Sequence, residues 1–502
     1  MRFLSEDNDD ATPAAYDAFV RLASNVLFLF IAAVPGCATH SAAPGVWAPC
    51  KIATIVATTQ ASCATYDMPR GAGREQQRPL SVAVTRLSAR EPVTGQLWML
   101  QGGPGGSGQS LIDAASQLQA LLPGFEIYLL DHRGTGGSTY LGCPELIENG
   151  SFKSMADLPA CAREATRREG DLGAFGTRQA ADDLGRLIER LRRPQVRTLV
   201  WGGSYGAYWA SRYLQAFPLQ ADGVVLDSGC LGNTCRLADT DRWLEDDAHT
   251  FLNACAANVT CSAHFSGDPW TIAQGLARRF EGGWCAPATL DRGRVRALLS
   301  GVALEAPTLL APLLRRLDRC DANDIAALRF AKTALAGGGN GDPGFSPVLQ
   351  DTIVLSELWN LAAPADLAAE DTTATFTTGQ AIRWTAEWST WPRYTPDTEA
   401  GRWNAPRIPV LAIRGGRDLR LPRDVSAAGA SRLGVSEVVV EEASHGVLLH
   451  SACGTSIIVS FLRDPKARLD TACASVSGDI APDSNQSRLL FGTEDAWGDE
   501  AR

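Results

Sequence analysis

The stretch Thr198-Leu199-Val200-Trp201-Gly202-Gly203-Ser204-Tyr205-Gly206 decides how the rest of this sequence is interpreted. Its first half is an apolar run typical of a buried strand, and a helix is predicted from Tyr205 to about Ala216. The residues between them match the pattern G-x-S-x-G. A sharp strand-to-helix turn needs small residues on both sides of the serine, and it exposes the Oγ atom of Ser204. The stretch therefore predicts a nucleophilic serine, and the alternative is a turn serine that only caps the helix.

Apolar strands alternate with helical segments on both sides of this turn. Strands are predicted at 80–84, 96–100, 126–131, 198–202, 222–227, 409–413 and 437–440, and helices at 176–193, 205–216 and 453–463. Such alternation is typical of a mostly parallel sheet flanked by helices on both faces. The alternation stops between 229 and 404, where the sequence has helical and loop character.

These changes divide the chain into five parts. We assign 1–43 to a signal or leader region, 44–228 and 405–475 to the two parts of an α/β core, 229–404 to a helical lid, and 476–502 to a loose polar tail. The sheet is then one structure whose course is interrupted by the lid.

A serine hydroxyl needs a base, and the base needs an orienting acid. The histidines are His40, His132, His249, His264, His445 and His450. His445 follows the strand 437–440 and is the predicted base. Asp418 follows the strand 409–413 and a glycine turn, and is the predicted acid; Asp227, after the preceding strand, is the alternative.

The developing negative charge on the substrate carbonyl requires fixed donors. Gln101-Gly102-Gly103-Pro104-Gly105-Gly106 follows a strand, and its glycines let backbone N–H groups approach a substrate. The oxyanion hole is assigned to the amides of Gly103 and Tyr205. A phosphate loop would need Gly-Lys-Ser/Thr, which is absent here, so ATP is not expected. Only six histidines are present and no CxxC pair occurs, so a zinc site has little support and no metal is expected. No cofactor is expected either.

Composition narrows the class of partner. The net charge is −10, which would repel a phosphate backbone, so nucleic acid is not an expected partner. Hydrophobic residues make up 45% and charged residues 20% of the chain, which excludes wholesale disorder. The expected partner is a peptide or small acyl substrate.

The N-terminal part indicates export. Arg21 precedes an apolar stretch, 22–36, that is too short for a stable membrane span and fits a secretory signal. The stretch ends at Cys37 in a sequence similar to a bacterial lipobox, so lipidation of Cys37 is one expectation and ordinary cleavage near 41–43 is the other. A buried helix of the fold is the third. The expected location is periplasmic, extracellular or lipid-anchored at the bacterial envelope, with membrane contact only through the lipid.

The cysteines agree with an oxidising compartment. Thirteen are present, and twelve remain when Cys37 is set aside. Plausible neighbours are Cys50–Cys63, Cys143–Cys161, Cys230–Cys235 or Cys255–Cys261, and Cys453–Cys473. Connectivity is not deducible from spacing alone.

Taken together, the motifs resemble the proline iminopeptidases of the α/β-hydrolase family and, more closely, secreted bacterial tripeptidyl aminopeptidases. Residues 102–108 resemble the GGPGGSG loop of that family, 131–138 its D-x-R-G-x-G-x-S segment, and 63–69 its early CAxxxVP stretch. The resemblance covers roughly 47–475. One departure is Gln101, where proline iminopeptidases usually carry histidine.

The resemblance implies an α/β-hydrolase fold with a large helical lid inserted after the sixth strand. It also implies acyl transfer from a peptide to Ser204 and release of residues from a free N-terminus. An exopeptidase must bind the substrate ammonium, which calls for a lid carboxylate. The candidates are Glu245, Asp246, Asp247, Glu305 and Glu357. Glu357 is chosen because its neighbours are apolar, where a charge is costly unless it is used.

Three functions remain open on the sequence. The first is a serine aminopeptidase with the triad Ser204, Asp418 and His445. The second is a carboxylesterase or other small acyl hydrolase, which the same triad would serve. The third is a non-catalytic surface binding protein, which predicts a broken triad or a blocked pocket.

Overall fold

The computed structural model describes residues 44–53, 58–71, 73, 77–148, 151–152, 155–232, 234–336, 342, 344–359, 373–476 and 480–499. The leader 1–43, including Cys37, lies outside the described residues. The expectations of a signal and of lipidation therefore stay predictions.

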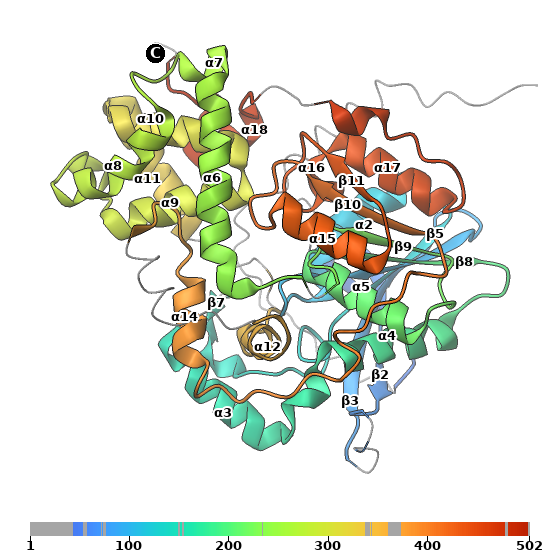
Figure 1. Cartoon of the computed structure of the whole chain (residues 1–502). Helices are drawn as coiled ribbons and strands as arrows, with labels where there is room; N and C mark the ends of the chain where they lie inside the picture. Colours follow the sequence, from blue (N-terminus) through green and yellow to red (C-terminus); the bar gives the residue numbers. More distant parts are fainter. Residues whose placement is uncertain are drawn as a thin grey trace, which may run out of the picture.

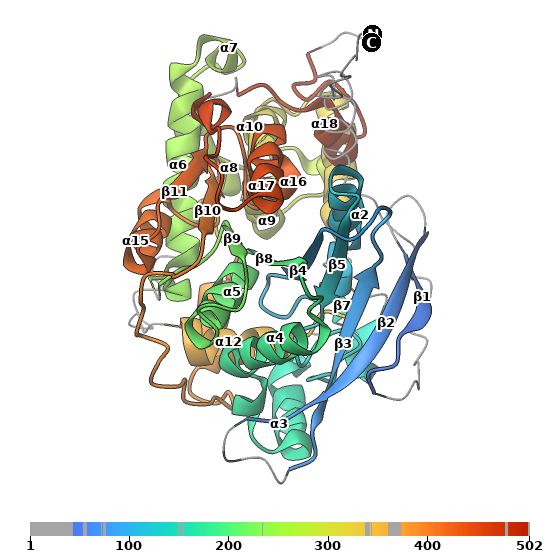
Figure 2. The same cartoon turned by 90° about the vertical axis from the view of Figure 1, so that its right-hand side faces the viewer.

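A nine-stranded sheet forms the centre of the molecule (Figure 1). In chain order its strands are β1 (Ala48–Ala53), β2 (Thr58–Met68), β3 (Leu80–Leu87), β4 (Gly95–Leu100), β5 (Phe125–Leu130), β8 (Arg197–Gly203), β9 (Gly223–Asp227), β10 (Val410–Gly415) and β11 (Glu437–Val440). Their order in space is β1-β2-β3-β5-β4-β8-β9-β10-β11. The six strands from β5 to β11 are parallel, whereas β1, β2 and β3 pair antiparallel at one edge (Figure 2).

The central strands are buried on both faces, as their near-continuous apolar runs predict. In β4, Trp98 and Leu100 join one core and Leu97 and Met99 join the other, because successive side chains point to opposite faces. Helices α4 (Thr177–Leu191), α5 (Tyr205–Ala216) and α15 (Arg423–Leu433) pack in the first core; α2 (Ile112–Leu121) and α17 (Ala452–Arg463) pack in the second. The predicted parallel sheet with helices on both faces is confirmed.

A group of helices is inserted between β9 and β10 (Figure 1). It contains α6 (Thr240–Ala257), α7 (Val259–Ser262), α8 (Pro269–Glu281), α9 (Arg292–Glu305), α10 (Leu310–Arg319), α11 (Ala322–Ala336), α12 (Pro347–Ile353) and α14 (Gln380–Glu387). In the described part of the large sheet, β9 is the seventh strand in chain order, since β1 adds a strand at the edge. We call residues 229–404 the lid.

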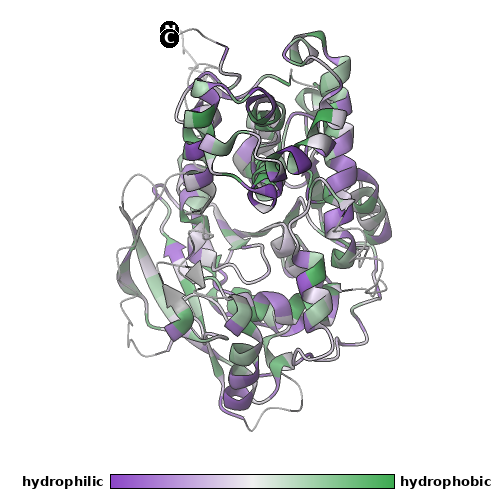
Figure 3. Cartoon of the chain, turned by 90° about the vertical axis from the view of Figure 1, so that its left-hand side faces the viewer, coloured by the Kyte–Doolittle hydropathy of each residue, from purple (hydrophilic) through white to green (hydrophobic). Residues whose placement is uncertain are grey.

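The first helices of the lid form a hydrophobic core of their own. On α6 the buried side chains include Leu244, Ala248, Phe251 and Cys255, which recur at the spacing of one helix face. Figure 3 shows hydrophilic and hydrophobic residues together on these helices, as expected for amphipathic helices. The first helices of the lid therefore have a core of their own, whereas α12 and α14 pack in the first core of the sheet.

The predicted loose tail is wrong for residues 480–499. They contain α18 (Ser484–Phe491), which packs against α11 and buries Phe491 in the core of the lid. The Nε atom of Arg316 donates to the carbonyl oxygen of Ala496 at 2.8 Å. Burial of an apolar side chain and binding of backbone carbonyls outweigh the polar composition that suggested a free tail.

All twelve cysteines after Cys37 form disulfides. The pairs are Cys50–Cys63, Cys143–Cys161, Cys230–Cys235, Cys255–Cys261, Cys285–Cys320 and Cys453–Cys473. Each neighbouring pair proposed from the sequence is present. So many disulfides indicate an oxidising, exported environment.

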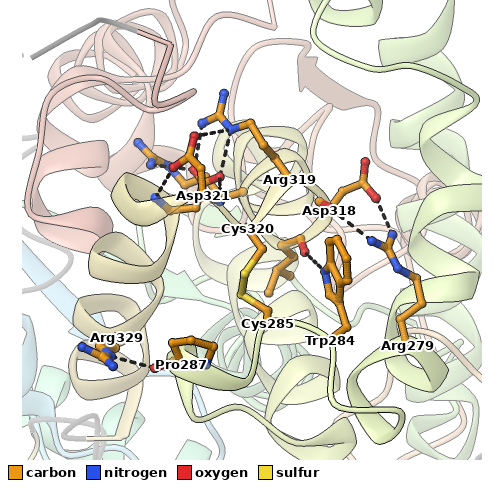
Figure 4. The surroundings of a disulfide bond; sticks show 12 residues. Arg279, Trp284, Cys285, Pro287, Asp318, Arg319, Cys320, Asp321 and Arg329 are labelled. Atoms are coloured by element: carbon orange, nitrogen blue, oxygen red, sulfur yellow. Dashed lines mark hydrogen bonds and ion pairs between the residues drawn. A yellow bond between two sulfur atoms is a disulfide. The ribbon is translucent and has the colours of Figure 1, made fainter.

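The pair Cys285–Cys320 was not predicted, because its partners lie 35 residues apart. Figure 4 shows its surroundings inside the lid. The indole of Trp284 donates to the carbonyl oxygen of Leu317 at 3.0 Å, and the guanidinium of Arg279 lies 4.1 Å from the Trp284 ring. This disulfide thus ties the turn after α8 to the end of α10.

Replacing both Cys285 and Cys320 with serine is expected to destabilise the lid. Chain-entropy arguments give about 3–4 kcal/mol for a closed loop of this length. Chemical denaturation followed by tryptophan fluorescence would measure the loss, with the Cys50→Ser/Cys63→Ser variant as a control outside the lid. An unchanged midpoint would contradict the stabilising role.

Within the described residues, no helix combines the length and apolar character needed to cross a bilayer.

Candidate active site

Ser204 lies at the junction of β8 and α5, in a strained backbone conformation. Its φ and ψ angles are 56° and −124°, a region that residues with side chains rarely occupy. A Cβ atom on Gly202 would overlap the carbonyl oxygen of Gly206, and one on Gly206 would overlap that of Leu100. The two glycines therefore allow the tight turn that the sequence predicted.

His445 and Asp418 are brought together by the loops that follow β11 and β10. The Nδ1 atom of His445 lies 2.8 Å from Oδ2 of Asp418, whose side chain is buried. The other oxygen of Asp418 accepts hydrogen bonds from the amides of Arg420 and Leu421 at 2.9 and 3.2 Å. With Nδ1–H donating to Asp418, the Nε2 atom of His445 is free to accept a proton.

Asp227 connects the serine turn with the histidine loop. Its backbone oxygen accepts from the amide of Ser204 at 2.8 Å. Its carboxylate accepts from the amides of Val447 and Leu448 at 2.9 and 3.0 Å, and burial raises the pKa of this carboxyl. The side chain weighed as an alternative acid therefore binds backbone groups rather than the imidazole.

Ser228, the residue after Asp227, also binds the loop that carries His445. The hydroxyl of Ser228 accepts from the amide of Gly446 at 3.0 Å, directly beside His445. Among the described residues, no hydrogen bond joins the hydroxyl of Ser204 to His445. Such contacts are often long in enzymes without substrate.

The glycine loop after β4 lies beside Ser204. A Cβ atom on Gly102 would lie 2.8 Å from the Cβ atom of Ser204, and Gly103 has a φ angle of 115°. The amide of Tyr205 is the first of α5, so it has no carbonyl partner within that helix. In the described part of the chain, neither it nor the amide of Gly103 donates to another acceptor. Two donors are therefore available next to the serine.

The side chain of Tyr205 makes contacts that do not involve its backbone amide. Its hydroxyl lies 2.8 Å from Oγ1 of Thr177 and 3.1 Å from Nε2 of His132. Burial lowers the pKa of His132 to about 3, so this ring stays neutral. These contacts fix the first turn of α5, and His132 is a structural residue, not a base.

Glu357 lies at the end of a helical turn in the lid, beside α4 and α5. Its carboxylate accepts from the amide of Thr177 at 2.9 Å, from the hydroxyl of Tyr208 at 3.1 Å and from the hydroxyl of Tyr394. It lines a cavity of about 380 Å³. The other lining residues are Asp171, Gly173, Arg178, Gln179, Arg212, Tyr394, Thr395, Pro396, Asp397 and Ala400.

Two other carboxylates considered for the ammonium have partners within the chain. Glu245 accepts from the amides of Thr375 and Phe376 at 3.1 and 2.7 Å, which makes it a cap for that segment. Glu305, at the end of α9, forms an ion pair with Arg420, two residues after Asp418. Of the five candidates, Glu357 is bound by neutral donors and faces a cavity.

Arg414 was not recognised from the sequence, and Asp247 was considered only as a ligand for the substrate ammonium. Arg414 is buried, and its Nη2 atom donates to the carbonyl oxygens of Asp418 and Leu421 at 3.3 and 3.0 Å. Burial raises the pKa of Asp247, on α6, to about 7, while the nearby Arg414 lowers it. The position of Arg414 inside the apolar strand 410–415 is the one feature of the sequence that indicates a buried charge here.

The stability of the protein is expected to fall between about pH 4 and pH 7 because of Asp247. Its folded pKa lies above the ordinary value of 3.8, so the unfolded chain releases this proton first as the pH rises. The variant Asp247→Asn lacks this ionisation, and its melting temperature should fall less from pH 5 to pH 8. Equal falls in both proteins would contradict the assignment.

Groups of three or more histidine, cysteine, aspartate or glutamate side chains that could hold a metal ion are absent from the described residues.

Comparison with known proteins agrees with this geometry. Residues 97–258 match a family model described as alpha/beta hydrolase fold. The proline iminopeptidase aneH of Aspergillus aculeatus is 28% identical over 142 residues, which cover 26% of this chain and 28% of that protein. The match thus spans less than a third of that relative.

Solved structures give a broader comparison. A proline iminopeptidase from Mycobacterium smegmatis is 15% identical with a TM-score of 0.36, covering 80% of this chain and 98% of that one. A thermophilic esterase from Thermogutta terrifontis is 13% identical with a TM-score of 0.36, covering 80% and 99%.

The sheet topology, the serine turn and the family match agree on the fold. The chain has an α/β-hydrolase fold, and part of it is similar to a proline iminopeptidase. The fold and the family match support a hydrolase.

Proposed function

We propose that the protein is a serine aminopeptidase that releases residues or short peptides from free N-termini. The observation that carries the proposal is Glu357, a lid carboxylate that faces a cavity and is held there by three neutral donors. A negative charge without a cationic partner in its hydrogen-bond shell suits the ammonium of a peptide.

The chemistry would proceed by acyl transfer. His445 takes the proton of Ser204 through Nε2 while Asp418 holds Nδ1–H, and the serine oxygen attacks the scissile carbonyl. The amides of Gly103 and Tyr205 stabilise the oxyanion. His445 then protonates the leaving amine, and water hydrolyses the acyl-enzyme through the same base.

The charge of the cavity supports a cationic ligand. It contains Asp171, Glu357 and Asp397 against Arg178 and Arg212. Arg212 is paired with Asp397, and Arg178 with Asp182 outside the cavity. Glu357 is thus a carboxylate of this cavity whose hydrogen bonds all come from neutral groups.

The second candidate is an esterase or another small acyl hydrolase. Its support is that both oxygens of Glu357 already accept hydrogen bonds from the chain, so this carboxylate has a structural use without any ammonium. A non-catalytic binding protein has less support, because the serine turn and the His445–Asp418 pair are intact. Export, with or without a lipid on Cys37, belongs to the same proposal.

The test compares the wild-type protein with Glu357→Gln on aminoacyl, dipeptidyl and tripeptidyl chromogenic amides. Each amide is offered with a free and with an acetylated N-terminus, beside a short-chain ester. We expect cleavage of free-amine amides only, and a higher KM in the Glu357 variant. The control is Glu245→Gln, whose carboxylate caps a lid segment.

Turnover of the ester without any amide would overturn the aminopeptidase proposal in favour of the esterase. Equal cleavage of free and acetylated amides would exclude recognition of the ammonium.

A further inference from the structure

Asp342 and Ser346 of the lid contact the glycine loop beside Ser204. Asp342 is buried, with 4% of its surface exposed. Its Oδ2 atom accepts from the amide of Ser107 at 2.6 Å, and its Oδ1 atom accepts from the hydroxyl of the same serine at 2.7 Å. One carboxylate therefore binds both hydrogen-bond donors of Ser107, four residues after Gly103.

A second contact holds the middle of the loop. The amide of Ser346 donates to the carbonyl oxygen of Gly105 at 2.9 Å. A Cβ atom on Gly105 would lie 2.6 Å from the carbonyl oxygen of Ser346, so the two backbones approach closely. The loop 102–108 is thus bound to the lid at Gly105 and at Ser107.

The lid segment is itself attached to the core. The amide of Gly136 donates to the carbonyl oxygen of Gly344, and the hydroxyl of Tyr140 donates to that of Phe345, at 2.9 and 2.8 Å. The amide of Gly344 also donates to Oδ1 of Asp342 at 2.9 Å. Asp342 is therefore bonded to Gly344, which is itself bonded to the core.

Five of the seven residues in 102–108 are glycines. Glycine has the greatest backbone freedom, so a loop of this composition is not rigid without external contacts. An oxyanion hole works only when its donors are already in place before the charge develops. The contacts of Asp342 with Ser107 restrict the backbone of this loop.

We infer that Asp342 is a positioning residue that holds the glycine loop so that the amide of Gly103 points to the oxyanion. The inference rests on the oxyanion role proposed for Gly103, and it applies to an amide or an ester alike. It makes the lid a part of the catalytic centre and not only a cover over it.

The test uses Asp342→Asn and Ser107→Ala in the full chain. An asparagine places an NH₂ group against a donor of Ser107, so we expect kcat to fall by about 10–100-fold with KM changed by less than about threefold. The affinity for a trifluoromethyl ketone that mimics the acyl group should fall by a similar factor, because the oxyanion forms in that complex. Ser107→Ala removes one of the two bonds and should lose less.

The control is Asp324→Asn, another buried lid carboxylate, which pairs with Arg316 and Arg319 away from the loop. It should lower the melting temperature and leave kcat unchanged. If Asp342→Asn loses stability as the control does and keeps its kcat and its affinity for the ketone, the inference is wrong.

Hydrogen–deuterium exchange of the peptide 102–108 gives a measurement that needs no substrate. We expect exchange at least about tenfold faster in Asp342→Asn than in the wild-type protein and in the control. Unchanged exchange would overturn the inference. Turnover of the ester alone would overturn the proposed aminopeptidase and leave this comparison intact, so the two failures are distinguishable.

Discussion

Replacing Ser204 with alanine is expected to lower kcat by about 10⁶-fold on any acyl substrate that the protein hydrolyses. The expected loss is large because the variant lacks the attacking oxygen, and water must react instead. The oxyanion donors and the binding of substrate remain, so a small residual rate is expected. Alanine tolerates the φ angle of 56° about as well as serine does, so the fold should persist.

The measurement is kcat in steady-state assays, together with labelling by a fluorophosphonate probe. The control is Ser211→Ala, which removes a buried hydroxyl on the same helix that donates to the carbonyl oxygen of Tyr208 at 2.6 Å. The control should label fully and keep its rate within a few-fold. Retention of more than about 1% of kcat by the Ser204 variant would exclude Ser204 as the nucleophile.

The features that the sequence predicted are those that depend on local chemistry. The strand before Ser204 was placed at 198–202 and is observed at Arg197–Gly203, because its apolar run is bounded by residues of the turn. The same reasoning predicted strands at 409–413 and 437–440, before Asp418 and His445, and they are observed at Val410–Gly415 and Glu437–Val440. Parallel strands present their carboxyl ends at one edge of a sheet, so side chains that follow these strands were expected to meet there.

The features that the sequence did not predict depend on contacts between distant segments. Asp342 lies in a glycine-rich stretch whose sequence is typical of a loop. No residue near it indicates that its partner is Ser107, which lies 235 residues earlier. The helix α18 has a polar composition and is fixed by contacts with Arg316 from the lid. The periodicity of apolar residues does not predict such interactions, because it indicates only which face of a helix or strand is buried.

The choice between Asp418 and Asp227 as the acid also depends on contacts that the sequence did not predict. Both follow buried strands of the sheet, and both are themselves buried, so position along the chain does not separate them. The hydrogen bonds do, since Asp418 binds the imidazole of His445 and Asp227 binds the amides of Val447 and Leu448.

Replacing Asp418 with asparagine is expected to lower kcat by about 10⁴-fold with little change in KM. The amides of Arg420 and Leu421 donate to Oδ1 of Asp418, so the amide oxygen of the asparagine should stay at that position. Its NH₂ group then faces Nδ1 of His445 and turns this atom into an acceptor. The proton moves to Nε2, which can no longer accept the proton of Ser204.

The matched variant is Asp227→Asn, which also replaces a buried carboxylate but leaves Nδ1–H of His445 bound to Asp418. It should lower the melting temperature, because one of the amides of Val447 and Leu448 loses its acceptor, and reduce kcat by no more than about tenfold. The dependence of kcat on pH distinguishes the two variants. Only the Asp418 variant should change the tautomer of His445, so only its profile should differ in shape from that of the wild-type protein. If the Asp227 variant loses the larger factor in kcat, then the contact between Asp418 and His445 seen in the resting protein is not the one used in catalysis.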